Sequence, residues 1–231
     1  MKSRMLLLIA ASLLFGANLS YAYAVTVNNA SFESPSPDNS WTSSITDGKW
    51  TPSVSGWPDS TGAVGTWLPG SGMFTSIPDG LQVAYLKQSS SISQLTTELL
   101  KDGYTYTLSA KVGTRDNSIP GGDTIFSGAM IELLADGNVL KSATSGTPTQ
   151  GGWVTVTLDY FFDASANPIG WEGKPLTLRL SSLGIGNQTN FDQISLTAVP
   201  LPAAAWLFGS ALLGLGWTKR FRRQPREALI A

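Results

Sequence analysis

The chain has 231 residues, no cysteine and no histidine, and a formal net charge of −1 at pH 7. The missing residue types exclude a disulfide framework, a Ser-His-Asp triad and the usual zinc and copper sites. The charge is unevenly spread, because residues 25–199 hold 15 of the 16 acidic but only 8 of the 15 basic residues, a net charge of −7 (8 minus 15). Since such a segment repels phosphate backbones, we expect no nucleic acid as a partner.

The N-terminus has the features of a secretory signal peptide. Lys2 and Arg4 precede an apolar run over residues 5–17, and Ala22-Tyr23-Ala24 supplies a small-x-small cleavage pattern. We expect residues 1–24 to form a signal helix that is removed after Ala24, with cleavage after Ala22 as the alternative. The other interpretation of the apolar run is a buried N-terminal helix.

The segment over residues 25–198 carries strand patterns. Residues 104–112 (YTYTLSAKV), 153–161 (WVTVTLDYF) and 176–181 (LTLRLS) alternate apolar and polar side chains, which indicates half-buried strands. Asp-Gly pairs at 47–48, 79–80, 102–103 and 136–137 are turn signals. The sequence therefore predicts an all-β domain, an antiparallel β-sandwich of the jelly-roll type. Irregular connections are expected over residues 56–72, which are rich in Gly, Pro and Trp.

Asp192 lies on the apolar side of the last predicted strand. It has the same parity as Ile194, Leu196 and Ala198, which are expected to face the core. A carboxylate in that position needs a partner, because burying an unpaired charge is energetically costly. Backbone amides, Arg179 or a hard cation could each serve.

Four segments together resemble the galactose-binding-like jelly rolls, a group that includes many carbohydrate-binding modules. They are residues 27–35 (VNNASFESP), 79–86 with 92–94 (DGLQVAYL and ISQ), 103–115 (GYTYTLSAKVGTR) and 190–196 (NFDQISL). The resemblance implies a structural Ca²⁺ held by Glu33 and Asp192, with backbone carbonyls completing its shell. Hydrogen bonding of these carboxylates to backbone amides is the alternative.

Six of the eight tryptophans lie between the two terminal segments. Aromatic rings that stack on sugar faces are the usual physical basis of carbohydrate binding. Trp153, on the outward side of its strand, and Trp171, in a turn-rich loop, are the candidate carbohydrate-binding residues. Trp57 is expected to pack in the core.

An apolar segment with a basic end closes the chain at residues 199–223. The 17 residues from Leu201 to Trp217 reach the lower limit for a membrane-spanning helix. The basic stop after this helix should stay cytoplasmic, as should the short tail over residues 224–231. Its members are Lys219, Arg220, Arg222 and Arg223.

The order of these features closely resembles the PEP-CTERM sorting signal in its VPLP variant. The motif here is Val199, Pro200, Leu201 and Pro202. The resemblance implies a precursor anchored in the inner membrane through its C-terminal helix, an exosortase-like processing enzyme as partner, and delivery to the cell surface or extracellular matrix. A generic uncleaved anchor is the alternative.

These features predict an exported, noncatalytic surface protein that contacts exopolysaccharide through its jelly roll. The alternatives are a carboxylate-dependent glycan-active enzyme and a purely structural protein on an uncleaved anchor. For the enzyme, Asp116 and Asp123 lie in one glycine-containing loop and could supply the two carboxylates that a glycosidase requires. Ordinary turn chemistry accounts for them as well, so no catalytic residue is assigned.

Overall fold

The computed structural model describes residues 21–34, 49–51, 54–57, 59–118, 126, 128–167, 170–184 and 188–201. This part of the chain contains no helix, and its strands are β1 (Tyr23–Val25), β2 (Lys49–Thr51), β3 (Asp59–Leu68), β4 (Val83–Leu99), β5 (Tyr104–Gly113), β6 (Ala129–Ala135), β7 (Asn138–Thr144), β8 (Trp153–Phe162), β9 (Pro175–Ser182) and β10 (Gln188–Pro200). The residues from Ala22 to Val199 form one compact unit.

The two terminal helices expected from the sequence lie outside the described residues. Within the described ranges, no helix combines the length and the apolar composition that crossing a membrane requires. β10 runs to Pro200, so the first two residues of the Val199–Pro202 motif continue the last strand. The basic residues from Lys219 to Arg223 are also not described.

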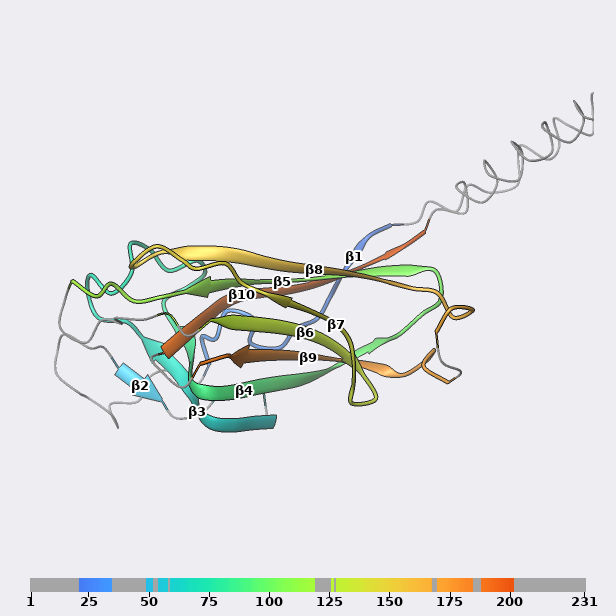
Figure 1. The fold of residues 1–231 in the computed structure, drawn as a ribbon, viewed down its shortest axis with the longest axis horizontal. Helices are drawn as coiled ribbons and strands as arrows, with labels where there is room; N and C mark the ends of the chain where they lie inside the picture. Colours follow the sequence, from blue (N-terminus) through green and yellow to red (C-terminus); the bar gives the residue numbers. More distant parts are fainter. Residues whose placement is uncertain are drawn as a thin grey trace, which may run out of the picture. The chain divides into compact units, whose positions relative to one another are not determined.

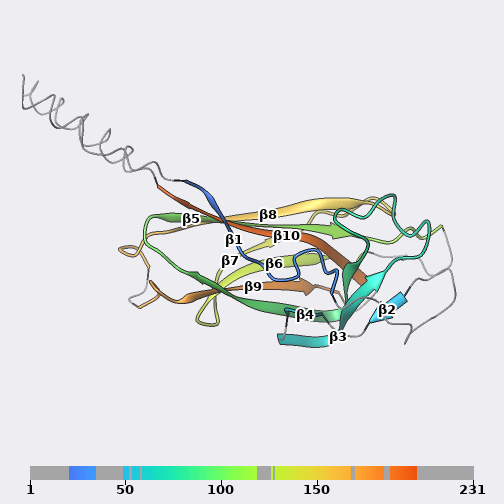
Figure 2. The ribbon, with the colours of Figure 1, turned by 180° about the vertical axis from the view of Figure 1, so that it is seen from behind.

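The strands build an antiparallel β-sandwich, which confirms the predicted fold class at this level (Figure 1). One layer contains β8, β5 and β10, with β1 beside β10, and the other contains β7, β6, β9, β4 and β3, with β2 beside β3. Figures 1 and 2 show β10 running obliquely from one layer to the other. Its C-terminal half pairs with β1, from Tyr23↔Ala198 to Val25↔Leu196, and its first residues pair with β4.

The apolar residues of the predicted alternating strands form the hydrophobic core. In β5, Leu108, Ala110 and Val112 are buried beside the inward residues of the neighbouring strand β8, and the buried leucines of β9 lie in the opposite layer of the same core. β5 pairs with β8 without interruption from Tyr104↔Phe162 to Gly113↔Trp153. The core stabilises the fold because each buried apolar side chain leaves water.

The expectation of irregular connections over residues 56–72 is wrong for most of that stretch. β3 occupies residues 59–68 and pairs with β4 from Asp59↔Ser93 to Trp67↔Val83, while β2 pairs with the end of β3. Glycine, serine and aspartate in β3 have weak intrinsic β-propensity, so the strand forms because β4 pairs with it on both sides of a register shift between Thr61 and Ala63. β4 itself bends at Gln88 and Ser89, whose φ angles are 57° and 56°.

Candidate active site

A second apolar cluster packs on the face of β4 that points away from the main core. Ala84 and Leu86 belong to the main core, whereas the alternate residues Val83 and Tyr85 belong to the second cluster. This division follows from the alternation of side chains along a strand. We call the cluster the aromatic face, and its members are Trp67, Met73, Phe74, Ile77, Val83, Tyr85 and Trp153.

Stacked rings and cations characterise the aromatic face. The Phe74 ring lies 4.8 Å from that of Trp153, with an interplanar angle of 29°, and 5.8 Å from the buried ring of Trp67. The guanidinium of Arg115 lies 5.5 Å from the Trp67 ring centroid, and Lys87 Nζ lies 5.7 Å from that of Tyr85. Of the seven members, Phe74, Ile77 and Trp153 are partly exposed, so a planar aromatic ligand would meet the cluster at these side chains and gain from contact with the two rings.

Neighbouring strands place one row of residues across the aromatic face. Tyr85 of β4 is opposite Gly65 of β3 and Asn190 of β10. Asn190 Nδ2 donates to the Gly113 carbonyl of β5 at 3.3 Å, and Gly113 is opposite Trp153 of β8. A Cβ atom on Gly113 would lie 2.6 Å from the Trp153 ring. The indole of Trp153 therefore lies directly over Gly113, where only glycine leaves room for it.

Two buried amides supply polarity on the same face. Gln188 and Asn190 are both fully buried, and Gln188 Nε2 donates to Asn190 Oδ1 at 2.5 Å. Gln188 Oε1 is buried without a hydrogen-bond donor among the described residues. An unsatisfied buried acceptor costs about 1–3 kcal/mol, so this oxygen favours a ligand that brings an N–H or O–H group.

Tyr85 and Asp116 are the groups that could take part in proton transfer here. Burial raises the pKa of the Tyr85 hydroxyl, which therefore stays protonated at neutral pH. Asp116 lies at the rim, where its backbone N–H donates to the Met73 carbonyl at 2.9 Å. Hydrogen bonds from Ser118 lower the pKa of the Asp116 carboxyl, so it is an anion at neutral pH. Asp123, its expected partner in a glycosidase, lies outside the described residues.

The two tryptophans predicted to bind carbohydrate do not meet. Trp153 begins β8, where its Nε1 donates to the Ser76 carbonyl at 2.8 Å. Trp171 follows the other end of that strand and packs against the main core. The structure places only Trp153 on the aromatic face. Trp57 is buried in the core against Phe32, as expected.

Glu33 and Asp192 both accept hydrogen bonds from backbone amides. Asp192 is fully buried, and its two oxygens accept from the N–H groups of Asp79 at 2.9 Å and Gln193 at 2.7 Å. Glu33 Oε1 accepts from Leu81 at 2.8 Å and Gln82 at 2.7 Å. Burial raises the pKa of Asp192 to about 7, and the nearby carboxylates of Asp79 and Glu33 act in the same direction.

Arg179 is not the partner of Asp192. Its guanidinium binds Glu132 through two hydrogen bonds, of 2.5 and 2.9 Å. Hard oxygen donors near Asp192 suit the chemistry of Ca²⁺. In the described part of the chain, however, no three carboxylate side chains converge to hold a metal ion, so backbone carbonyls would have to complete a calcium shell.

Comparison with known proteins identifies a family for this domain. The family model described as "HpiC1-like: HpiC1 cyclase" matches residues 23–197, and no curated protein matches the chain. A solved apo-form cyclase from Fischerella sp. is 22% identical, with a TM-score of 0.66, over 78% of this chain and 97% of its own.

Two further solved structures contain bound molecules. The Stig cyclase FisC from Fischerella sp. TAU, in complex with (3Z)-3-(1-methyl-2-pyrrolidinylidene)-3H-indole, is 24% identical with a TM-score of 0.65, over 78% of this chain and 99% of its own. A cyclase from the same source, in complex with 4-(1H-indol-3-yl)butan-2-one, is 24% identical with a TM-score of 0.63, over 77% and 98%.

These findings overturn the predicted role. The prediction of a noncatalytic protein that contacts exopolysaccharide is wrong, because the domain matches a family of enzymes. The match gives no support to the prediction that an exosortase processes the protein. The enzyme alternative was closer, although the family is one of cyclases. Export, surface location and the expected membrane and exosortase partners depend on the terminal segments and stay predictions.

Sequence reasoning also missed most of the aromatic face. Trp67 and Tyr85 come from the consecutive strands β3 and β4, whereas the amides beside them, Gln188 and Asn190, come from β10, which is far along the sequence. The one available signal was the DGLQVAYL stretch, in which Val83 and Tyr85 alternate with core residues.

Proposed function

The chain belongs to the HpiC1-like cyclase family, and from this premise we propose that it is an enzyme that closes a ring within a small indole-bearing molecule. The family match over residues 23–197 carries the proposal. The indole class is supported by the two similar cyclases that hold indole compounds. The aromatic face, with its stacked rings and buried amides, is the proposed binding site.

Each part of the aromatic face has a role in this proposal. The planar substrate contacts the cluster at the partly exposed side chains of Phe74 and Trp153, and Gln188 Oε1 accepts a hydrogen bond from its indole N–H. The Tyr85 hydroxyl donates a proton to the reacting side chain, and the Asp116 carboxylate stabilises the positive charge that develops. Ring closure forms a bond within one molecule, and the cyclised cation then returns a proton. Substrate and product are therefore isomers.

Direct assay of the purified protein tests this function. Binding of 4-(1H-indol-3-yl)butan-2-one would be followed by tryptophan fluorescence, and turnover by mass spectrometry and NMR of indoles that carry an alkene or ketone side chain. We expect binding, and a product with the mass of the substrate and one additional ring. A folded protein that neither binds the ketone nor converts any indole would contradict the proposal.

We also propose that the domain is exported. The support is the order of basic residues, apolar run and small-x-small pattern in residues 1–24, together with the apolar segment and basic stop in residues 199–223. In this proposal the two segments are the helices that bring the precursor to the inner membrane. Fractionation of cells that express the full chain would test it, because a protein found only in the cytosol is incompatible with export.

A further inference from the structure

Tyr23 marks the point at which the chain enters the folded domain. Tyr21 is 71% exposed and Ala22 is also exposed, whereas Tyr23 is half-buried and Val25 is buried. Tyr23 is also the first residue of β1 and pairs with Ala198 of β10. The bond between Ala22 and Tyr23 therefore joins an exposed segment to a paired strand.

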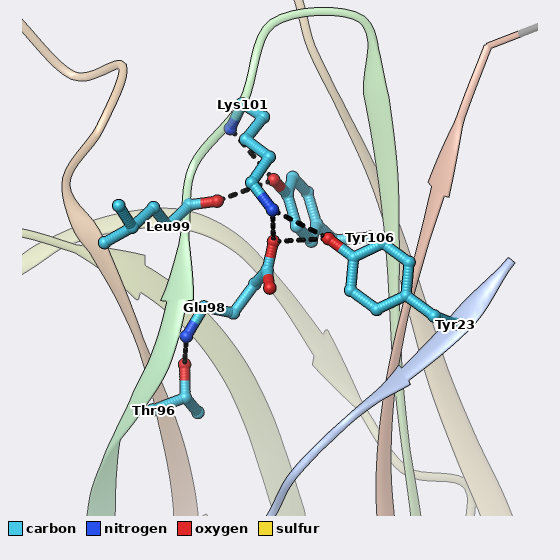
Figure 3. A network of polar contacts seen from close by, with 6 residues as sticks. All are labelled: Tyr23, Thr96, Glu98, Leu99, Lys101 and Tyr106. Atoms are coloured by element: carbon cyan, nitrogen blue, oxygen red, sulfur yellow. Dashed lines mark hydrogen bonds and ion pairs between the residues drawn. The ribbon is translucent and has the colours of Figure 1, made fainter. Parts of the chain in front are cut away.

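The side chain of Tyr23 completes a closed network of polar contacts (Figure 3). Its hydroxyl donates to Glu98 Oε1 at 2.7 Å and accepts from Lys101 Nζ at 2.9 Å, and Lys101 Nζ is 2.7 Å from the same carboxylate oxygen. Lys101 Nζ also lies 5.4 Å from the ring centroids of both Tyr23 and Tyr104. This network holds β1 against the turn between β4 and β5.

Cleavage after Ala24 would dismantle this arrangement. It would remove Tyr23 and Ala24, which make two of the three pairs between β1 and β10. Glu98, whose side chain is only 10% exposed, would lose one of its two side-chain donors. Removing one partner of a buried polar group leaves the other partly unsatisfied and costs stability.

We infer that signal peptidase cleaves between Ala22 and Tyr23, so that Tyr23 is the first residue of the mature enzyme. This inference rests on the proposed export and replaces the expected cleavage after Ala24. Ser20-Tyr21-Ala22 also satisfies the small-x-small pattern, and the family match begins at residue 23. Water hydrolyses the peptide bond, which leaves a carboxylate on Ala22 and an ammonium group on Tyr23.

The test is N-terminal sequencing and intact-mass analysis of the protein exported from a Gram-negative host that expresses the full chain. Wild-type protein is compared with Ala24→Gln, which removes the small residue required for cleavage after position 24. Ala24 is exposed, so the substitution should not disturb folding. Both proteins should begin with Tyr23 and be exported in equal amounts.

A mature wild-type chain that begins with Val25, or an Ala24→Gln variant that is no longer processed, would overturn the inference. An uncut chain in the cytosol would overturn it together with export. Neither result depends on cyclase activity, which is measured separately on the same purified protein. A failure of the proposed reaction is therefore distinguishable from a failure of this processing site.

Discussion

Gly113 permits the indole of Trp153 to lie against the sheet, and a single methyl group tests its role. In Gly113→Ala the added Cβ would lie 2.6 Å from the Trp153 ring, so the indole must move. We expect a loss of about 1–3 kcal/mol in the free energy of unfolding. Ring closure should slow by roughly 100-fold, because Trp153 and the Phe74 ring that packs on it, which contact the substrate, are misplaced. Near-UV circular dichroism and the indole assay measure the two effects.

Gly146→Ala is the matched control for this substitution. A Cβ at Gly146 meets no atom within 4 Å, and its backbone is not in the left-handed region. This variant should keep wild-type stability, spectrum and activity. If Gly113→Ala behaves in the same way as Gly146→Ala, the aromatic face is not the site of reaction.

Substitution of Gly80 tests how much the hydrogen bonds of the Glu33 carboxylate contribute to stability. In Gly80→Ala the new Cβ would lie 2.3 Å from Glu33 Oε1, the oxygen that accepts the N–H groups of Leu81 and Gln82. Gly103→Ala is the control, because its φ of +73° matches the +68° of Gly80 while its Cβ would meet no atom within 4 Å. Both variants carry the backbone strain of about 1 kcal/mol. Gly80→Ala should lose a further 1–3 kcal/mol, roughly, in urea denaturation; equal losses would show that the Glu33 contact contributes nothing.

At the scale of the element, β1 is short and depends on the hydroxyl of Tyr23. In Tyr23→Phe the ring stays beside Tyr104, while the hydrogen bonds with Glu98 and Lys101 are lost. We expect a loss of about 1 kcal/mol in the free energy of unfolding. Tyr104→Phe is the control, since its ring belongs to the same cluster and its hydroxyl has no hydrogen bond in the described structure. Equal stability of the two variants would mean that the Tyr23 network does not hold β1.

Strand patterns were predictable where a strand keeps one buried and one solvated face. β5, β8 and β9 meet this condition, and their alternation is plain in the sequence. β3 could not be predicted in this way, because its glycines and small polar residues pair with β4 through the backbone. Asp192 is buried, as predicted, but the alternation used to predict it breaks near Gln193, whose φ is 48°, because Phe191 lies in the core together with Ile194. Its amide partner Asp79 lies 113 residues away in the sequence.

At the scale of the whole molecule, the candidate site is a product of topology. Trp67, Tyr85, Asn190 and Trp153 meet because β3, β4, β10, β5 and β8 are neighbours in the sheet order. The spacing of residues in the sequence does not reveal this strand order, so of these four residues only Trp153 was predicted to lie in a binding site. The resemblance to jelly rolls led to a sandwich and, incorrectly, to carbohydrate, because one fold supports many functions.

Three segments that are far apart in the sequence meet around Asp192: residues 30–33, Asp79 and residues 192–194. Ser31 Oγ donates to Asp79 Oδ2 at 2.7 Å, and the Ile194 N–H donates to the Ala30 carbonyl at 2.9 Å. Glu33 lies in the first of these segments, and its charge adds to the negative potential at Asp192. Binding of Ca²⁺ here would offset the repulsion among the carboxylates and link the three segments.

We expect Ca²⁺ to stabilise the whole domain as a ligand that binds only the folded state. At a concentration of 100 times its dissociation constant, such a ligand adds about 2.7 kcal/mol, which raises the melting temperature by roughly 5–10 °C for a domain of this size. Melting would be recorded with calcium, with magnesium and with a calcium chelator. Magnesium should have little effect, because it demands a stricter octahedral shell. If metal-free protein melts at the same temperature with and without calcium, backbone amides alone satisfy Glu33 and Asp192, and the segments are held without a cation.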